Sequence, residues 1–217
     1  MLFLAIECSS ARRSVACGST DGLVLASAHH DQGRGTPLLA LTEQVLREAG
    51  ANRRDVSRFV MGLGPGSYTG IRSSLALAQG WKLATGVPLQ GIEASDACAQ
   101  VARRQGLVGD FTVVIDAQRG EFYVAGFRIG TSGFAGLSPL RLATRAELDV
   151  LASEGASLIG PDLPLAGLNG TRILPDASAL IEIAARIPPP DPAAPPLEPI
   201  YLRATSFVKA PPPRVLR

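Results

Sequence analysis

A glycine-rich segment, GPGSYTGIR at residues 64–72, constrains the fold more than any other part of the sequence. It follows an apolar run that predicts a strand, and it opens a helical pattern that Thr69 could cap. Gly64, Gly66 and Gly70 allow backbone torsions and close approaches that other residues resist. The segment lacks the Lys-Ser/Thr pair of a Walker loop and the spacing of a dinucleotide site, so the pattern favours a structural turn.

The rest of the chain alternates short apolar runs, typical of strands, with helical patterns. The expected strands are residues 1–6, 14–18, 23–28, 59–63, 87–92, 111–115, 122–129 and 156–159. The expected helices are residues 38–49, 69–85, 95–105, 145–153 and 177–187. Because strands begin again near residue 107, we predict an N-terminal lobe at 1–106 and a smaller C-terminal lobe at 107–217. The second lobe includes the proline-rich stretch 188–199, which we expect to be an extended linker.

The composition is that of an ordinary globular protein, which we expect to stay in the cytoplasm. The chain has 217 residues, 46% of them hydrophobic, which is enough for two compact lobes. Its 21 basic and 19 acidic side chains give a formal charge of +2, so no strong field attracts nucleic acid or membranes. Glu7 interrupts the apolar start before it could form a signal peptide or membrane span. The three cysteines lack C-x-x-C spacing, and we expect them to be small buried hydrophobes.

Two helices carry more apolar and small residues than one packing face needs. The first, at 38–49, places large apolar residues on one side, and the second, at 71–85, carries small residues four positions apart. The candidate partner interface is Leu38, Leu41, Val45, Ile71, Ser74, Leu75 and Ala78. The same residues could instead form the core of the chain itself, and the residues alone leave both interpretations open.

Side chains that could carry catalysis are few. His29 and His30 are adjacent, and neighbours in a strand point to opposite faces, so they cannot share one metal ion as an H-x-x-x-H pair on a helix does. Glu7, Asp116 and Glu121 are candidate carboxylates, but a solvent-facing role is favoured for them. The chain has no H-E-x-x-H and no G-x-S-x-G motif. We therefore expect no catalytic and no metal-binding residues.

Several segments in combination resemble one known family. They are LAIECSS near the start, GPGSYTGIR with the following SLALAQGWKLATGVPLQGIEASDA, then VIDAQRGEFYVAGF and the late PIYLR. The resemblance to the TsaB (YeaZ) family covers almost the entire chain. It implies an α/β ASKHA fold, the actin/Hsp70-like and ribonuclease H-like architecture in which two lobes carry mixed central sheets flanked by helices. It also implies a role in making N6-threonylcarbamoyladenosine (t6A) in tRNA.

The resemblance further implies a set of partners. A TsaD-type subunit transfers the threonylcarbamoyl group, a TsaE-type ATPase is accessory, and a TsaC-type enzyme supplies threonylcarbamoyl-AMP. The chain would pair with the TsaD-type subunit through the two helices, or form a homodimer in its absence. It would meet tRNA only indirectly, through the complex.

The first hairpin turn of each lobe holds nucleotide phosphates in ASKHA proteins, here residues 7–10 and 116–120. The resemblance thus implies a nucleotide site at Glu7, Ser9, Ser10 and Asp116. TsaB relatives usually have Asp where Glu7 stands, and the segment IGPDLPL at 159–165 offers one glycine where an adenosine loop is expected. We therefore expect no obligatory cofactor and only weak ATP or ADP binding.

Two functions remain in view. The first is a noncatalytic scaffold and dimerisation subunit of the t6A complex. The second is a nucleotide- or metal-dependent enzyme of the ASKHA or glycoprotease-like type. A kinase needs an intact phosphate cradle with a catalytic Asp, and a peptidase needs its metal ligands; the sequence offers at best fragments of both.

Overall fold

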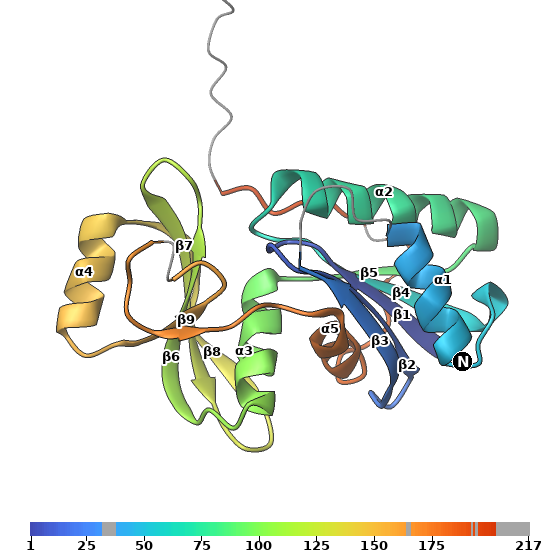
Figure 1. Ribbon diagram of the computed structural model, residues 1–217, viewed down its shortest axis with the longest axis horizontal. Coiled ribbons are helices and arrows are strands. Elements are labelled where there is room, and N and C mark those ends of the chain that lie inside the picture. The colour runs from blue at the N-terminus through green and yellow to red at the C-terminus, as the bar shows by residue number, and fades with distance from the viewer. Residues whose placement is uncertain (32–37, 164–165, 192, 194, 203–217) are drawn as a thin grey trace, which may run out of the picture.

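The structure is a computed structural model that describes residues 1–31, 38–163, 166–191, 193 and 195–202. It contains two five-stranded sheets, with helices between them and on their outer faces (Figure 1). Helices α3 (Ala94–Arg104) and α5 (Ala177–Ala184) lie between the sheets. Helices α1 (Leu38–Glu48) and α2 (Tyr68–Thr85) cover the outer face of the first sheet, and α4 (Arg145–Ser153) covers the outer face of the second. The expected two-lobe α/β fold with mixed, helix-flanked sheets is confirmed.

The first sheet has the strand order β3-β2-β1-β4-β5. Its strands are β1 (Leu2–Glu7), β2 (Arg13–Ser19), β3 (Val24–His30), β4 (Val56–Gly62) and β5 (Leu89–Ile92). The first three pair antiparallel, whereas β4 and β5 run parallel to β1. A short 3-10 helix, Arg53–Asp55, leads into β4.

The second sheet repeats this plan. Its strands are β6 (Gly109–Asp116), β7 (Glu121–Ile129), β8 (Phe134–Thr144), β9 (Ser157–Gly160) and β10 (Thr171–Arg172). The order is β10-β9-β6-β7-β8, with an antiparallel meander on one side of β6 and parallel strands on the other. The first strand of each lobe is therefore central, and its hairpin turn faces the other lobe's turn across the space between the sheets.

The sequence patterns missed two strands, β8 and β10. Strand β8 is an edge strand whose residues are mostly exposed, so it lacks the apolar alternation that marks a half-buried strand. It also contains Pro139, which an edge strand tolerates because one side of its backbone needs no partner. Strand β10 has only two residues, too few for any pattern.

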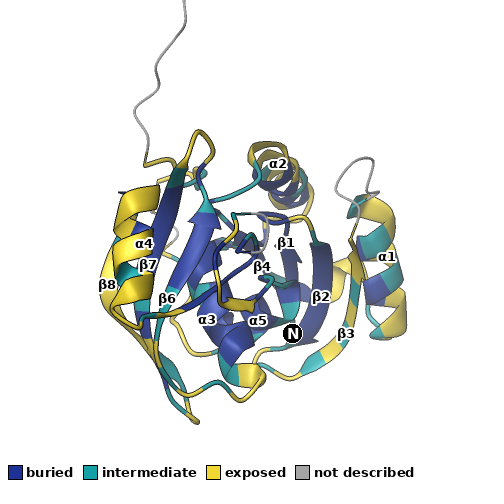
Figure 2. Cartoon of the chain, turned by 60° about the vertical axis from the view of Figure 1, so that its left-hand side comes forward, coloured by how far each residue is buried: buried dark blue, intermediate teal, exposed yellow. Residues whose placement is uncertain are grey.

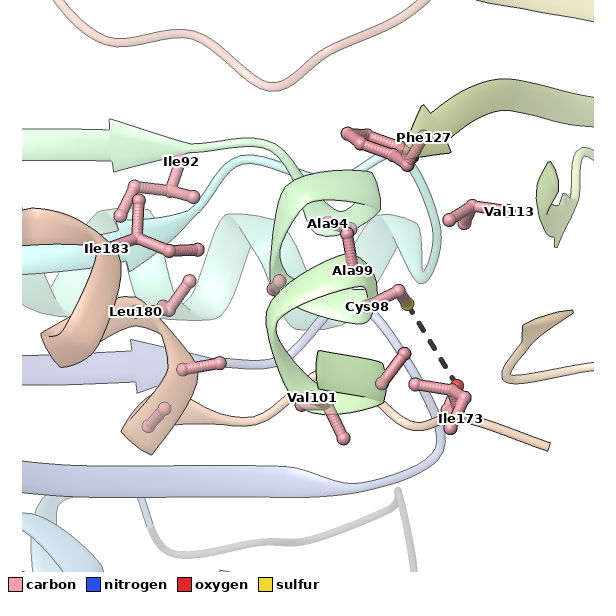
Figure 3. Packing of buried hydrophobic residues seen from close by; sticks show 14 of the residues in the cluster. Ile92, Ala94, Cys98, Ala99, Val101, Val113, Phe127, Ile173, Leu180 and Ile183 are labelled. Carbon is pink, nitrogen blue, oxygen red and sulfur yellow. Dashed lines mark hydrogen bonds between the residues drawn. The ribbon is translucent and has the colours of Figure 1, made fainter. Parts of the chain in front are cut away.

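Alternation along β1 divides the core of the first lobe into two layers. Phe3 and Ala5 face α3 and α5, and Leu4 and Ile6 face α1 and α2. The layer between the sheets is continuous across both lobes, because α3 packs against residues of both (Figure 3). Cys98 lies at its centre, with its thiol 3.9 Å from the carbonyl oxygen of Ile173. All three cysteines are buried and free, as expected.

The C-terminal part of the chain returns to the first lobe. Helix α5 packs against β1, β2 and β4 and against α3. Residues 195–202, which we call the C-terminal strap, follow the proline-rich stretch and run along the first lobe (Figure 1). There Leu197 packs against the core under α1 and α2, and the Ile200 N–H donates to the Leu63 carbonyl oxygen at 2.9 Å. Part of the segment assigned to the second lobe from sequence thus completes the first.

Within the described residues, the helices are too short or too polar to cross a bilayer.

Because α5 packs between the two sheets, its buried leucine should contribute strongly to stability. Leu180 is fully buried in the continuous core. We expect Leu180→Ala to lower the free energy of unfolding by about 2–5 kcal/mol, through lost apolar burial and the cavity left behind. Urea denaturation measures this. The control is Leu83→Ala, since Leu83 is 89% exposed and its loss should change stability by less than about 0.5 kcal/mol. Equal effects of the two substitutions would contradict the placement of α5.

Candidate functional site: the cleft between the lobes

A cleft of about 930 Å³ opens between the lobes. Its walls come from the β1–β2 turn, the β6–β7 turn, the segment that opens α2, and the C-terminal strap. Of the residues predicted as nucleotide ligands, Ser9, Ser10 and Asp116 line this cleft. Glu7 does not, because its side chain is fully buried below the turn. Nucleotide binding here stays a prediction.

Burial of Glu7 corrects the expectation that its carboxylate faces solvent. The Oε1 atom accepts a hydrogen bond from the Ser9 N–H at 2.5 Å, while Oε2 is buried without a partner among the described residues. Gly62 on the neighbouring strand makes room for it, because a Cβ there would overlap the carboxylate. Burial raises the pKa of Glu7, against the opposing effects of the Ser9 hydrogen bonds and the Arg13 charge.

The β1–β2 turn is tied directly to the start of α2. The Ser67 N–H donates to the Ser9 carbonyl oxygen at 2.6 Å. The Arg13 guanidinium donates to the carbonyl oxygens of Cys8 and Ser10 and, at 2.9 Å, to the Ser67 hydroxyl. The two bonds that involve Ser67 link the first hairpin of the lobe to the start of the helix, while the other two hold the hairpin turn itself.

Two glycines let these segments touch. A Cβ on Gly66 would overlap the Ser9 carbonyl, and one on Gly70 would overlap the Cys8 carbonyl. Gly64 adopts φ of 86°, in the left-handed region that favours glycine. Ser67, rather than Thr69, caps the helix by accepting a bond from the Gly70 N–H at 3.3 Å. The fold therefore explains why glycine occupies these three positions of the segment.

The β6–β7 turn forms the opposite wall and has an uncommon backbone. Gln118 and Arg119 have φ of 64° and 61°, a region that non-glycine residues seldom adopt. The Asp116 carboxylate holds the turn by accepting from the Gln118 backbone N–H at 2.7 Å and from its side-chain amide at 2.9 Å. Asp162 lies beside it, and burial raises the pKa of its carboxyl group.

An aromatic and cationic cluster forms the rim of the cleft. The Arg72 guanidinium lies 3.7 Å from the ring centroid of Tyr68 and 5.7 Å from that of Tyr201. The sequence interpretation did not single out these three residues as a site. Their signal was present, since Tyr68 and Arg72 belong to GPGSYTGIR and Tyr201 to PIYLR, but only the fold brings the two segments together.

The structure divides the predicted partner-interface residues into two groups. Val45, Ile71, Ser74 and Ala78 are buried inside the chain, beneath the two helices. Leu38, Leu41 and Leu75 are half-buried and pack against the same core. These faces of α1 and α2 therefore serve the chain's own core, which was the alternative interpretation. Each of the two helices also has an exposed side (Figure 2). The exposed residues include Leu39 on α1 and Leu83 on α2.

The two histidines lie at the end of β3, outside the residues that line the cleft. Both are exposed, and His29 Nε2 is 3.8 Å from an Asp31 carboxylate oxygen. In the part of the chain that the structure describes, no three His, Cys, Asp or Glu side chains form a group that could hold a metal ion.

Burial of the Glu7 carboxyl group predicts a pH dependence of stability. A carboxyl whose folded-state pKa is raised stabilises the fold fully below its unfolded-state pKa and loses that stability as pH rises toward the folded-state pKa. We expect the free energy of unfolding to fall as pH rises above about 4.3, the usual Glu value. In Glu7→Gln this fall should be smaller, because the amide does not ionise. Denaturant melts at several pH values measure both slopes; parallel slopes would contradict the prediction.

Comparison with known proteins agrees with this architecture. The sequence model described as "TsaD: tRNA N6-adenosine threonylcarbamoyltransferase" matches residues 24–163. The TsaB protein of Escherichia coli, named for tRNA threonylcarbamoyladenosine biosynthesis, is 31% identical over 138 residues, which are 61% of this chain and 58% of that protein. An uncharacterized protein of Mycobacterium leprae is 33% identical over 82% of this chain and 45% of its own length. One from Mycobacterium tuberculosis is 31% identical over 82% of this chain and 76% of its own.

The chain thus spans about half the length of the first two relatives. Among solved structures, YeaZ from Pseudomonas aeruginosa has the same fold, with a TM-score of 0.74 at 23% identity over 85% of this chain and 91% of that one. A structure described as similar to peptidase YeaZ gives 0.77 at 23% identity, over 93% and 99%. The chain therefore belongs to the TsaD-like sequence family and, within it, to the TsaB (YeaZ) group.

Proposed function

We propose that the chain is a noncatalytic subunit of a bacterial t6A-synthesis complex, where it binds and supports a TsaD-type catalytic subunit. The observation that carries the proposal is the pair of exposed leucines on the two helices that cover the outer face of the first sheet. Leu83 on α2 is 89% exposed and Leu39 on α1 is 51% exposed. The biological process in the proposal, t6A synthesis, comes from the names of relatives, since several are called tRNA threonylcarbamoyladenosine biosynthesis proteins.

Helices α1 and α2 suit a helical partner. Their inner faces are already used by the chain's own core, so the helices are held in place before any partner binds. On the outer side, Ala76 and Gly80 are exposed, and a Cβ added at Gly80 would meet no atom within 4 Å. Small residues on α2 near the exposed Leu83 let a partner helix approach closely while large side chains fill the space beside it. Without the TsaD-type subunit, a second copy of the chain would take the same surface.

The scaffold role needs no cofactor of its own. Ser9, Ser10 and Asp116 could contact a nucleotide in the cleft, while Glu7 is buried beneath it. We therefore expect weak ATP or ADP binding by the isolated chain. A TsaE-type ATPase belongs to the same proposed complex.

Charge placed on the outer helical surface should weaken the complex. We expect Leu83→Glu and Leu39→Glu each to raise the dissociation constant for a purified TsaD-type subunit roughly 30-fold, the effect of losing a central interface residue. Isothermal calorimetry measures this, and light scattering gives the mass of the complex. Ala78 is unsuitable for this test because it is fully buried in the core.

Leu137→Glu is the matched control, since Leu137 is 50% exposed on β8 of the other lobe. All three variants should keep the wild-type circular-dichroism spectrum and cooperative melting. If Leu83→Glu and Leu39→Glu are folded and bind as tightly as Leu137→Glu, the partner does not use this surface.

Reconstituted t6A synthesis tests the function itself. With TsaD-type and TsaE-type proteins, threonylcarbamoyl-AMP, ATP and tRNA, we expect t6A to form only when the chain is present. The rate of t6A formation should fall in Leu83→Glu in proportion to its weaker binding to the TsaD-type subunit. Mass spectrometry of tRNA nucleosides provides the readout. Formation of t6A by the chain alone, or at full rate without it, would falsify the noncatalytic scaffold role.

A further inference from the structure

The rim of the cleft carries a cluster of three flat groups, two aromatic rings and a guanidinium, that belong to none of the apolar core clusters. Tyr68 begins α2 and Tyr201 lies in the C-terminal strap, and their ring centroids are 5.9 Å apart at a tilt of 35°. The Arg72 guanidinium packs against both rings. Tyr68 remains 56% exposed and Tyr201 44% exposed, so much of the surface of each side chain is open to a ligand.

Cationic groups without a carboxylate partner line the same cleft. Among the described residues, neither Arg72 nor Arg119 forms an ion pair, whereas the exposed Arg128 and Arg145 do. Arg119 lies on the second-lobe wall of the cleft. Its backbone is in the left-handed region, a conformation that costs free energy for a residue other than glycine. An exposed arginine in this position, across the cleft from the aromatic cluster, can bind an anionic ligand.

The second-lobe wall adds hydrogen-bond acceptors. Asp116 and Asp162 line the cleft together with Arg119. A carboxylate accepts hydrogen bonds from the amino groups of a nucleic-acid base, and an arginine donates to phosphate oxygens. The cleft thus offers flat groups on which a base can stack, arginine N–H groups that can donate to a phosphate, and carboxylates that can accept from the edge of a base. Together these groups are typical of a site for an unpaired nucleotide.

We propose that this cleft binds an unpaired nucleotide of the tRNA that the complex modifies, with its base against the exposed surface of the cluster of Tyr68, Arg72 and Tyr201 and its phosphate on Arg119. The proposal deepens the proposed function, because it gives the scaffold subunit a direct contact with the substrate. RNA-binding proteins recognise loops in this way, since unstacked bases can lie on aromatic rings.

The formal charge of +2 favoured only indirect contact with tRNA, but that figure averages over the whole surface. Residues 203–217, which directly follow the strap that carries Tyr201, contain Arg203, Lys209, Arg214 and Arg217 and no acidic residue. The whole-chain charge thus understates how closely cationic residues are grouped in this part of the sequence, and such groups favour salt-dependent binding to an RNA backbone.

Fluorescence anisotropy of the full chain with labelled RNA tests the proposal. The probes are a hairpin with a single-stranded loop and a blunt duplex with the same number of phosphates, and unlabelled ATP serves as a competitor. We expect the hairpin to bind more tightly than the duplex. Tyr201→Leu and Arg119→Asn should each weaken hairpin binding about tenfold, the scale of one lost stacking or phosphate contact. Asn is chosen because it tolerates the left-handed backbone at this position.

Arg128→Gln is the control for charge, because Arg128 is exposed on β7 and paired with Asp110; it should leave hairpin binding unchanged. Equal affinity for hairpin and duplex, or equal loss in Arg128→Gln and Arg119→Asn, would overturn the proposal. So would ATP binding as tight as that of the hairpin, which would identify a free mononucleotide as the ligand.

The same variants separate this proposal from the scaffold function. Neither Tyr201 nor Arg119 belongs to α1 or α2, so both variants should bind the TsaD-type subunit like the wild type. Loss of hairpin binding with an intact complex supports the RNA site. Wild-type hairpin binding by both variants refutes it, whatever the TsaD-type subunit does.

Discussion

The contact between the first hairpin turn and the opening of α2 is the constraint on which the first lobe depends. Ser67 donates its N–H to Ser9 and receives a hydrogen bond from Arg13, while Gly66 and Gly70 let the two backbones touch. Any side chain at either glycine would separate them. This contact fixes the direction in which α2 leaves the sheet, and so fixes both the outer helical surface and one wall of the cleft.

Local patterns predicted the elements whose signals are local. The helix at 145–153, the strands of the first meander and the first two strands of the second could be recognised because period and turn residues mark them. Strand β8 was missed because an exposed edge strand has no alternation to detect. Burial of Glu7 could not be predicted either, since it requires knowing that β1 lies beside β4, where Gly62 leaves room for the carboxylate.

The same distinction between local patterns and contacts that depend on the fold applies to the residues of the site. Ser9, Ser10 and Asp116 were identified because hairpin turns are visible in sequence, and they line the cleft. Tyr201 and Tyr68 meet across a separation of more than half the chain, and no periodicity encodes such a contact. The partner-interface residues illustrate a different limit of sequence patterns. An apolar helical face indicates burial, but it does not say whether the chain itself or another protein provides the cover, and here the chain covers Val45 and Ala78 itself.

Helix α2 connects the two surfaces to which functions are proposed. Its outer side carries Leu83, and its first turns carry Tyr68 and Arg72 at the cleft. The strap is bonded next to that first turn, since the Ile200 N–H donates to Leu63, directly before the glycine-rich segment. A partner on the outer face and a nucleotide in the cleft would thus contact the same rigid helix without competing for the same residues. Such an arrangement lets one small subunit hold a catalytic partner and its RNA substrate in a fixed relative position, which is the physical content of a scaffold role.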